Sequence, residues 1–355
     1  MTSRDEALAA LAKVIDPELR KPITELGMVG EITGTSIAIK LTVPTCPAAE
    51  KIRAEAQQAI DHLGLTAELT VMTQDERNAL KEQLRAGKPP RTNPFDENTL
   101  TRVFLVGSGK GGVGKSTLTA NLAVALAQQC FSVGLIDADI FGYSIPGQLG
   151  IKDKPTQLDE MILPPVAFGV KVISIGMFVD GSQAVAWRGP MLHRTIEQFL
   201  KDVFWGQLDF LLIDMPPGTG DVAISLGQAL PTARSLVVTT PQEAAAEVAL
   251  RSGAVGIQTG QSVFGVIENM SWLVQPDGSK LELFGTGGGL AVSKHLETSL
   301  LGQVPLSIAL REGSDRGMPV ILGSPEDPAS LEIAKLAQKI VESKLDLKGK
   351  RLPLA

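Results

Sequence analysis

Gly109-Lys110-Gly111-Gly112-Val113-Gly114-Lys115-Ser116-Thr117 is the stretch that decides the fold, because it meets the pattern G-x-x-x-x-G-K-[ST] and carries a second lysine inside it. Residues 102–106 before it predict a short buried strand, and residues 116–127 after it predict an apolar-rich helix. Its glycines allow a tight turn, so that backbone N–H groups and the helix N-terminus converge on anionic oxygens. The stretch therefore predicts a loop that binds the phosphates of a nucleotide.

Within this loop we expect every residue from Gly109 to Thr117 to contact ATP. The Lys115 ammonium is expected to reach the β- and γ-phosphates, and the Ser116 hydroxyl to ligate Mg²⁺. A chance glycine-rich turn is the alternative, and the agreement of both flanks argues against it.

Strands and helices alternate along the chain from residue 99 onward. Apolar strands are expected at residues 103–107, 133–137, 170–175, 210–214, 235–239 and 263–267. This order predicts an α/β fold with a doubly wound, mostly parallel sheet covered by helices on both faces. Ligands of such sheets bind beyond the carboxyl ends of the strands.

Residues 1–80 predict a separate small α+β domain, with helices at residues 6–15 and 47–62 and strands at residues 37–43 and 65–72. Residues 81–98 are polar and contain prolines, as expected of an exposed linker. The P-loop ATPase domain is expected at residues 99–345, followed by a frayed tail at residues 346–355.

The composition excludes several classes of function. A net charge of -6 provides no broad basic surface, which argues against nucleic acid as a partner. No apolar run approaches the ~20 residues that span a bilayer, and the N-terminus lacks the apolar core of a signal peptide. Two cysteines suit a reducing compartment, so we expect a cytoplasmic protein without a membrane partner.

Carboxylates follow two of the expected strands. Asp137 and Asp139 end one strand, where Asp137 would hold Mg²⁺ through its water shell and Asp139 would act on the attacking water. Asp214 ends another strand and would hold Mg²⁺ through water, and the Gly218 N–H would sense the γ-phosphate. The alternatives are strand-capping aspartates and an ordinary Pro-Gly turn.

These motifs, together with Arg188-Gly-Pro-Met191 and Glu268-Asn-Met-Ser271, resemble the Mrp-type iron-sulfur cluster carrier ATPases. That family belongs to the deviant-Walker class, which also holds MinD and the nitrogenase iron protein. The resemblance implies a Mg-dependent ATP-hydrolysing homodimer that delivers clusters to apo iron-sulfur proteins or works with an assembly scaffold. It also implies that Lys110 reaches the nucleotide of the facing subunit, that Asp139 is the switch aspartate and that Asn269 lies near the adenine ring.

Two stretches of the N-terminal part, Asp16-Pro-Glu-Leu19 and Leu41-Thr-Val-Pro-Thr-Cys46-Pro47, resemble the SufT/PaaD-like domain often fused ahead of such ATPases. Cys46 matches the cysteine of that domain, which makes it a candidate cluster ligand. A helix N-terminus beside it would lower the pKa of the thiol. A small buried apolar cysteine is the alternative.

One departure from the family concerns the cluster. Mrp-type proteins usually carry C-x-x-C shortly after E-N-M-S, which provides four thiolates across a homodimer for one bridging cluster. This chain has Gln275 and Gly278 at those positions, and neither supplies the soft thiolate that iron-sulfur clusters require. Cys130 is expected in the core, and His193 and His295 lack the spacing of metal ligands.

Three functional hypotheses follow. The first is an ATP-dependent iron-sulfur cluster carrier, and the retained Arg188-Gly-Pro-Met191 run favours it. The second is a MinD-like dimeric switch that recruits a partner without carrying a cluster, which the missing C-x-x-C favours. The third is a conventional phosphotransferase, which Lys110 and the lack of a second substrate motif argue against.

Overall fold

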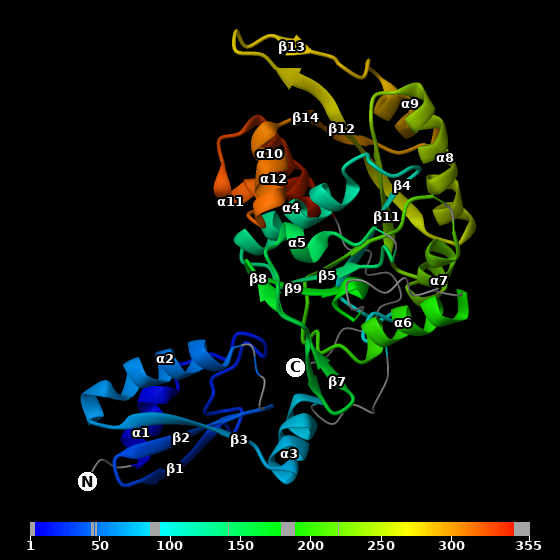
Figure 1. Ribbon diagram of the computed structural model, residues 1–355. Helices are drawn as coiled ribbons and strands as arrows, with labels where there is room; N and C mark the ends of the chain where they lie inside the picture. The colour runs from blue at the N-terminus through cyan, green and yellow to red at the C-terminus, as the bar shows by residue number, and fades with distance from the viewer. Residues whose placement is uncertain are drawn as a thin grey trace. The chain divides into compact units, whose positions relative to one another are not determined.

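The computed structural model describes residues 4–43, 46, 48–85, 93–140, 142–178, 189–218 and 220–343 (Figure 1). The chain forms two compact units. The N-terminal unit comprises Met1–Thr92, Asp153–Val166 and Asp202–Phe204, and the main unit comprises Asn93–Lys152, Ala167–Lys201 and Trp205–Ala355. The expected tail at residues 346–355 lies outside the described residues.

The N-terminal unit combines helices with a three-stranded mixed sheet of order β1-β2-β3, in which β1 and β2 are antiparallel and β2 and β3 parallel. Its elements in order are α1 (Arg4–Leu11), β1 (Val29–Thr33), β2 (Ser36–Leu41), α2 (Ala49–Ile60), the 3-10 helix η1 (Asp61–Leu63), β3 (Thr66–Val71) and α3 (Gln74–Arg85). Strand β1 was not expected, because Gly30 interrupts its apolar pattern; a Cβ at Gly30 would lie 2.8 Å from that of Ala38 on β2. Residues 81–85, expected as linker, complete helix α3.

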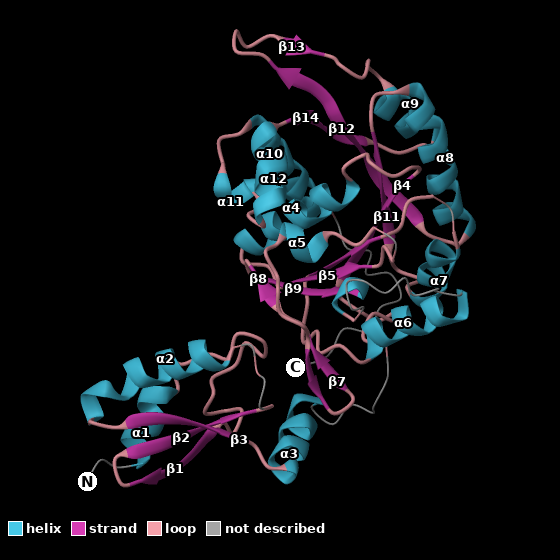
Figure 2. Cartoon of the chain, in the orientation of Figure 1, coloured by secondary structure: helices cyan, strands magenta, loops and turns pink. Residues whose placement is uncertain are grey.

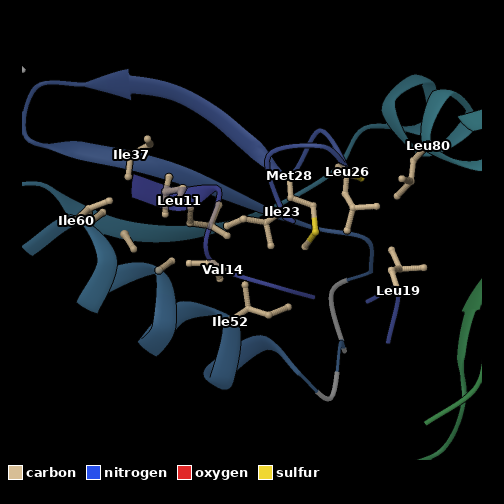
Figure 3. Packing of buried hydrophobic residues seen from close by; sticks show 14 of the residues in the cluster. Leu11, Val14, Leu19, Ile23, Leu26, Met28, Ile37, Ile52, Ile60 and Leu80 are labelled. Carbon is tan, nitrogen blue, oxygen red and sulfur yellow. The ribbon is translucent and has the colours of Figure 1, made fainter. Parts of the chain in front are cut away.

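The core of this unit follows from two periodicities. In β2 every second residue is buried, which directs Ile37, Ile39 and Leu41 to one face. In α2 the buried residues recur every fourth position, at Ile52, Ala56 and Ile60. Figure 3 shows several of these side chains packed together with apolar residues of the segment before β1.

A hairpin from the middle of the chain completes that core. Strands β6 (Thr156–Leu158) and β7 (Met161–Leu163) pair antiparallel, and Leu158, Met161 and Leu163 belong to the N-terminal apolar cluster. The Thr156 hydroxyl also donates to the Glu18 carboxylate at 3.0 Å. The N-terminal unit is therefore discontinuous in sequence, because part of its core is encoded more than sixty residues beyond its other elements.

Leu158→Ala is expected to lower the free energy of unfolding of the N-terminal unit by about 2–5 kcal/mol, because it removes a fully buried side chain from this shared core. Hydrogen exchange of peptides from β2 and α2 measures the effect in the full chain. Gln157→Ala is the matched control, because Gln157 is exposed on the same strand. Equal exchange protection in the two variants would show that the hairpin does not support the unit.

The main unit is built on a mostly parallel sheet of order β13-β12-β11-β4-β10-β5-β9-β8, with β14 also pairing with β12. Its strands are β4 (Arg102–Ser108), β5 (Val133–Asp137), β8 (Val166–Ala167), β9 (Val170–Ser174), β10 (Phe210–Asp214), β11 (Arg234–Thr239), β12 (Ser262–Val274), β13 (Lys280–Leu281) and β14 (Leu300–Leu306). The predicted doubly wound α/β fold is confirmed. Strand β14 was missed because Gly302 and Pro305 disrupt its apolar pattern, and β12 extends seven residues beyond the expected end at Ile267.

Helices cover both faces of this sheet (Figure 2). One layer contains α4 (Lys115–Gln128), α5 (Ile145–Gln148), α10 (Ile308–Arg316), α11 (Val320–Gly323) and α12 (Pro328–Glu342). The other contains α6 (Gly189–Lys201), α7 (Asp221–Ala229), α8 (Glu243–Gln258) and α9 (Gly288–His295), and a 3-10 helix, η2 (Ile175–Met177), follows β9. Among the described residues, no helix is long and apolar enough to cross a membrane.

Candidate functional site

The phosphate loop connects β4 to α4, as its sequence predicts. Gly112 and Gly114 adopt φ values of 80° and 77°, a left-handed backbone that favours glycine. Gly109 is required for a different reason: a Cβ there would lie 2.3 Å from the backbone nitrogen of Ala249 in α8. The loop therefore fits its place only with glycine at these three positions.

Asp214 lies at the centre of the site, at the end of β10. Its carboxylate is fully buried and pairs with the Lys115 ammonium at 2.7 Å. The Ser116 hydroxyl donates to Oδ2 of Asp214 at 2.6 Å. Burial raises the pKa of Asp214, and the adjacent Lys115 ammonium opposes that increase. The three residues predicted to serve the phosphates and Mg²⁺ are thus brought together.

Thr119 is a member of this group that the sequence analysis missed. Its hydroxyl lies one helical turn after Lys115 and within 3.0 Å of Oδ1 of Asp214. The sequence could have indicated Thr119, because it lies four residues after Lys115 and positions i and i+4 of a helix share one face. Thr119 and Ser116 therefore hold the two oxygens of the Asp214 carboxylate from the same helix.

Asp137 lies beside Asp214, because β5 and β10 are parallel neighbours whose last residues pair in register. Its buried carboxylate accepts hydrogen bonds at Oδ2 from the amides of Ser144 and Ile145 and from the hydroxyl of Ser174. Burial, and then the charge of Asp214, raise the pKa of Asp137 to about 7. Asp137 thus anchors the start of α5 through Oδ2, and its Oδ1 accepts from the amide of Asp139 at 3.2 Å.

Asp139 and Lys110 occupy the rim of the same site. Asp139 is largely buried, and its Oδ1 accepts from the amide of Gly142 at 2.9 Å. The Lys110 backbone carbonyl accepts from the Ser108 hydroxyl at 3.1 Å, and the residue is half-buried. Their predicted roles, on the attacking water and across a dimer, stay predictions.

The Gly218 amide has a backbone partner in the structure. It donates to the carbonyl of Ser108 at 2.8 Å, because the chain leaving β10 crosses the end of β4. Gly218 has a φ of 92°, so its conformation suits glycine. The amide thus binds the strand that leads into the phosphate loop, and its expected role toward the γ-phosphate stays a prediction.

Asn269 contacts the phosphate loop directly. Its side-chain Nδ2 donates to the carbonyl of Val113 at 2.8 Å, and a Cβ on Gly114 would lie only 2.3 Å from that nitrogen. The expected proximity of Asn269 to the adenine ring stays a prediction. In the structure, Asn269 contacts the backbone of the phosphate loop itself.

The positions of the missing C-x-x-C lie in the hairpin formed by β12 and β13. Gln275 and Gly278 belong to its tight turn, where the Gly278 amide donates to the Gln275 carbonyl at 2.9 Å. Gly278 has a φ of 83°, so a cysteine there would be strained. Within the described ranges, no group of three or more His, Cys, Asp or Glu side chains is arranged to hold a metal ion.

The predictions for the two cysteines require correction. Cys130 was expected in the core but is exposed, because it follows the end of α4 with a left-handed φ of 65° that turns it outward. Cys46 was expected to have a lowered pKa, but burial and the nearby Glu18 carboxylate raise the pKa of its thiol to about 11. Amides at the start of α2 oppose these effects without overcoming them.

Glu18 and Asp16 complete the surroundings of Cys46. Oδ1 of Asp16 accepts from the amides of Glu18 and Leu19, at 2.9 and 2.8 Å, which fixes the turn of the Asp16-Pro-Glu-Leu19 run. Burial, followed by the charge of Asp16, raises the pKa of Glu18 to about 7. Pro47, beside Cys46, and Arg188, of the Arg-Gly-Pro-Met run, lie outside the described residues.

Family models match both parts of the chain. Residues 99–341 match the NUBPL iron-transfer P-loop NTPase family, and residues 4–71 match a family described as iron-sulfur cluster assembly protein. Among curated proteins, the iron-sulfur cluster carrier protein of Mycobacterium leprae is 49% identical, over 97% of this chain and 94% of that protein. The carrier protein of Synechocystis is 39% identical, over 96% of this chain and 97% of its own length.

Solved structures resemble the main unit. A nucleotide-binding protein of Archaeoglobus fulgidus in complex with ADP is 34% identical, covers 67% of this chain and 95% of its own, and has a TM-score of 0.57. The septum site-determining protein MinD of Pyrococcus horikoshii, complexed with Mg-ADP, is 25% identical over 70% of this chain and 98% of its own, with a TM-score of 0.53. These comparisons agree with the architecture built from β4, α4 and β10.

Proposed function

This chain belongs to the iron-sulfur cluster carrier family of ATP-binding P-loop NTPases, and from that membership we propose that it hydrolyses ATP as a homodimer and delivers clusters to apo-proteins. One observation carries the catalytic part of this proposal. Lys115, Ser116 and Thr119, all from the first turns of α4, converge on the buried carboxylate of Asp214. Such a set aligns a cation and hydroxyls at the helix N-terminus, where phosphates bind.

The oxygens at this site fit Mg²⁺. Hard cations of this size prefer carboxylate and hydroxyl oxygens, and Ser116 Oγ and Asp214 Oδ2 lie 2.6 Å apart at the end of the phosphate loop. Mg²⁺, when bound, would neutralise charge on the β- and γ-phosphates. Asp137, with one oxygen already accepting three hydrogen bonds, is better suited to the outer water shell than to direct ligation.

Asp139 and Lys110 supply the remaining catalytic groups of the proposal. Asp139 lies at the carboxyl end of the sheet, where its carboxylate would orient the attacking water. Lys110, on the rim of the loop, would reach the phosphates bound by a second subunit. The dimer is thus part of the proposed mechanism, because each nucleotide would receive a cation from the facing chain.

Lys115→Ala is expected to weaken Mg-ATP binding at least about tenfold, because a charge-assisted contact to phosphate contributes roughly 1.5–3 kcal/mol. Isothermal titration calorimetry measures the change in affinity, and circular dichroism verifies that the variant is folded. Lys152→Ala is the matched control, because Lys152 is an exposed lysine with no expected contact to the nucleotide. Unchanged Mg-ATP affinity in folded Lys115→Ala protein would contradict the assignment of the phosphate loop.

For the cluster, we propose Cys46 as the ligand that this chain supplies. Cys46 lies in the segment matched by the iron-sulfur cluster assembly family, and the hairpin of the main unit offers Gln275 and Gly278 instead of thiols. Two subunits provide two such thiolates, fewer than the four that an ordinary cluster uses. A thiol pKa raised to about 11 also makes protons strong competitors of iron. Both features favour a weakly held cluster, completed by small thiols or by the receiving protein.

A MinD-like switch is the second candidate. It is favoured by the same hairpin, whose tight turn at Gln275 and Gly278 leaves the usual position of the bridging cluster without thiols. A switch would bind ATP and recruit a partner but carry no iron. Iron loading therefore separates the two candidates.

A further inference from the structure

Strand β12 contains an unusual residue at the edge of the nucleotide site. Met270 has a φ of 58°, in the left-handed region that a residue with a Cβ rarely adopts. The pairing of β12 with β14 is irregular between Asn269 and Leu273, around this residue. Asn269, which contacts Val113 in the phosphate loop, directly precedes it. Something in the surrounding structure must hold this turn in place.

The buried carboxylate of Glu268 is suited to that task. Glu268 is 1% exposed, and its Oε1 accepts from the Ser271 hydroxyl at 3.0 Å and from Nε2 of Gln303 at 2.6 Å. Its Oε2 accepts from the amide of Gly289 at 2.7 Å. The Glu268 side chain therefore connects three places: Ser271, which follows Met270, strand β14 through Gln303, and the N-terminus of α9 through Gly289.

The glycines at the start of α9 fit this arrangement. A Cβ on Gly289 would lie 2.7 Å from the Cβ of Glu268, and one on Gly288 would lie 2.5 Å from the carbonyl oxygen of Pro241. The helix thus approaches β12 closely enough for its amide to reach the carboxylate. A carboxylate near a helix N-terminus is also favoured by the helix dipole.

We propose that Glu268 is a positioning residue for nucleotide binding, which holds the turn at Met270 and thereby sets the Asn269 amide against the phosphate loop. Glu268 and Asn269 are consecutive, so their side chains leave β12 in different directions. Glu268 fixes the strand from the side of α9 and β14, and Asn269 transmits that position to the Val113 carbonyl. The inference rests on the ATP-binding site of the family and is independent of the proposed hydrolysis.

Replacing the carboxylate by an amide disturbs this set of contacts. All three partners of Glu268 donate hydrogen bonds, so a glutamine is accommodated only where the Gln303 amide turns over and the Ser271 hydroxyl donates to the backbone carbonyl of residue 268 alone. Exchanging the two residues, however, restores a match. In a chain with Glu268→Gln and Gln303→Glu, the new amide can donate to the new carboxylate and still accept from Gly289.

The test measures Mg-ADP affinity by calorimetry in Glu268→Gln, Gln303→Glu and the double variant, each well below its unfolding temperature. Both single variants are expected to bind about fivefold more weakly or worse, and the double variant to return within about twofold of wild type. A residue with only a structural role would lower thermal stability but leave the affinity of the folded protein unchanged.

Wild-type affinity in folded Glu268→Gln protein would overturn the inference, and so would a double variant as weak as the single ones. If Glu268→Gln does not fold, Ser271→Ala replaces it, because it removes one donor and keeps the charge. Weaker Mg-ADP binding by Ser271→Ala supports the inference, and unchanged binding overturns it. Absence of ATP hydrolysis by the wild type would contradict the proposed function alone, because this test measures only ADP binding.

Discussion

A mixture of Lys110→Ala and Lys115→Ala subunits is expected to hydrolyse ATP although each variant alone is inactive. The Lys110→Ala homodimer should bind Mg-ATP normally and lose about 10³-fold in turnover, as enzymes do when a cation supplied in trans is removed. In the mixed dimer, the Lys110→Ala subunit binds nucleotide and the Lys115→Ala subunit supplies the intact Lys110 to it. One complete site is thereby restored.

The hydrolysis rate that the mixture should recover can be calculated. With equal amounts and random pairing, half of the dimers are mixed and each has one complete site, so about a quarter of the wild-type rate should return. A phosphate-release assay on refolded or co-expressed mixtures measures it. A mixture that stays inactive, although mixed dimers are present by mass spectrometry, would show that Lys110 acts within its own chain or that no dimer forms the site.

The features that were predictable from sequence are those encoded in local patterns. The phosphate loop requires glycine at fixed positions, and the structure shows why at Gly109, Gly112 and Gly114. Asp214 could be placed because a buried apolar strand leads to it and parallel strands end at the same edge. The family was also recognisable, since its motifs extend over most of the chain.

Features that depend on distant partners were not predictable. The hairpin at residues 156–163 completes the N-terminal core, but nothing in its short strands identifies that core as its partner. The direction of the Gly218 amide depends on how the chain crosses β4. Burial and the charge of Glu18, which motif spacing does not reveal, reverse the expected pKa shift of Cys46. The exposure of Cys130 follows from the left-handed turn after α4, which the sequence did not indicate.

The contacts of Glu268 were likewise not predictable from the sequence. E-N-M-S could be matched to a family motif, yet its first residue acts through Gln303 and Gly289, which lie far along the chain. Three hydrogen-bond donors to one buried carboxylate can be recognised only once the packing of the strands and helices is known.

We propose that the chain holds iron through Cys46, since Gln275 and Gly278 stand at the positions expected for C-x-x-C. Anaerobic reconstitution with iron, sulfide and glutathione tests it most directly, with bound iron and visible absorbance measured after gel filtration. Wild type and the Cys130→Ser control are expected to retain iron, and Cys46→Ser to retain none, because Cys46 belongs to the segment of sequence matched to cluster assembly and the exposed Cys130 does not. All three proteins should still bind Mg-ADP, which verifies that the main unit is intact. Equal iron in wild type and Cys46→Ser would contradict the assignment of the ligand, and no iron in any of them would favour the MinD-like switch.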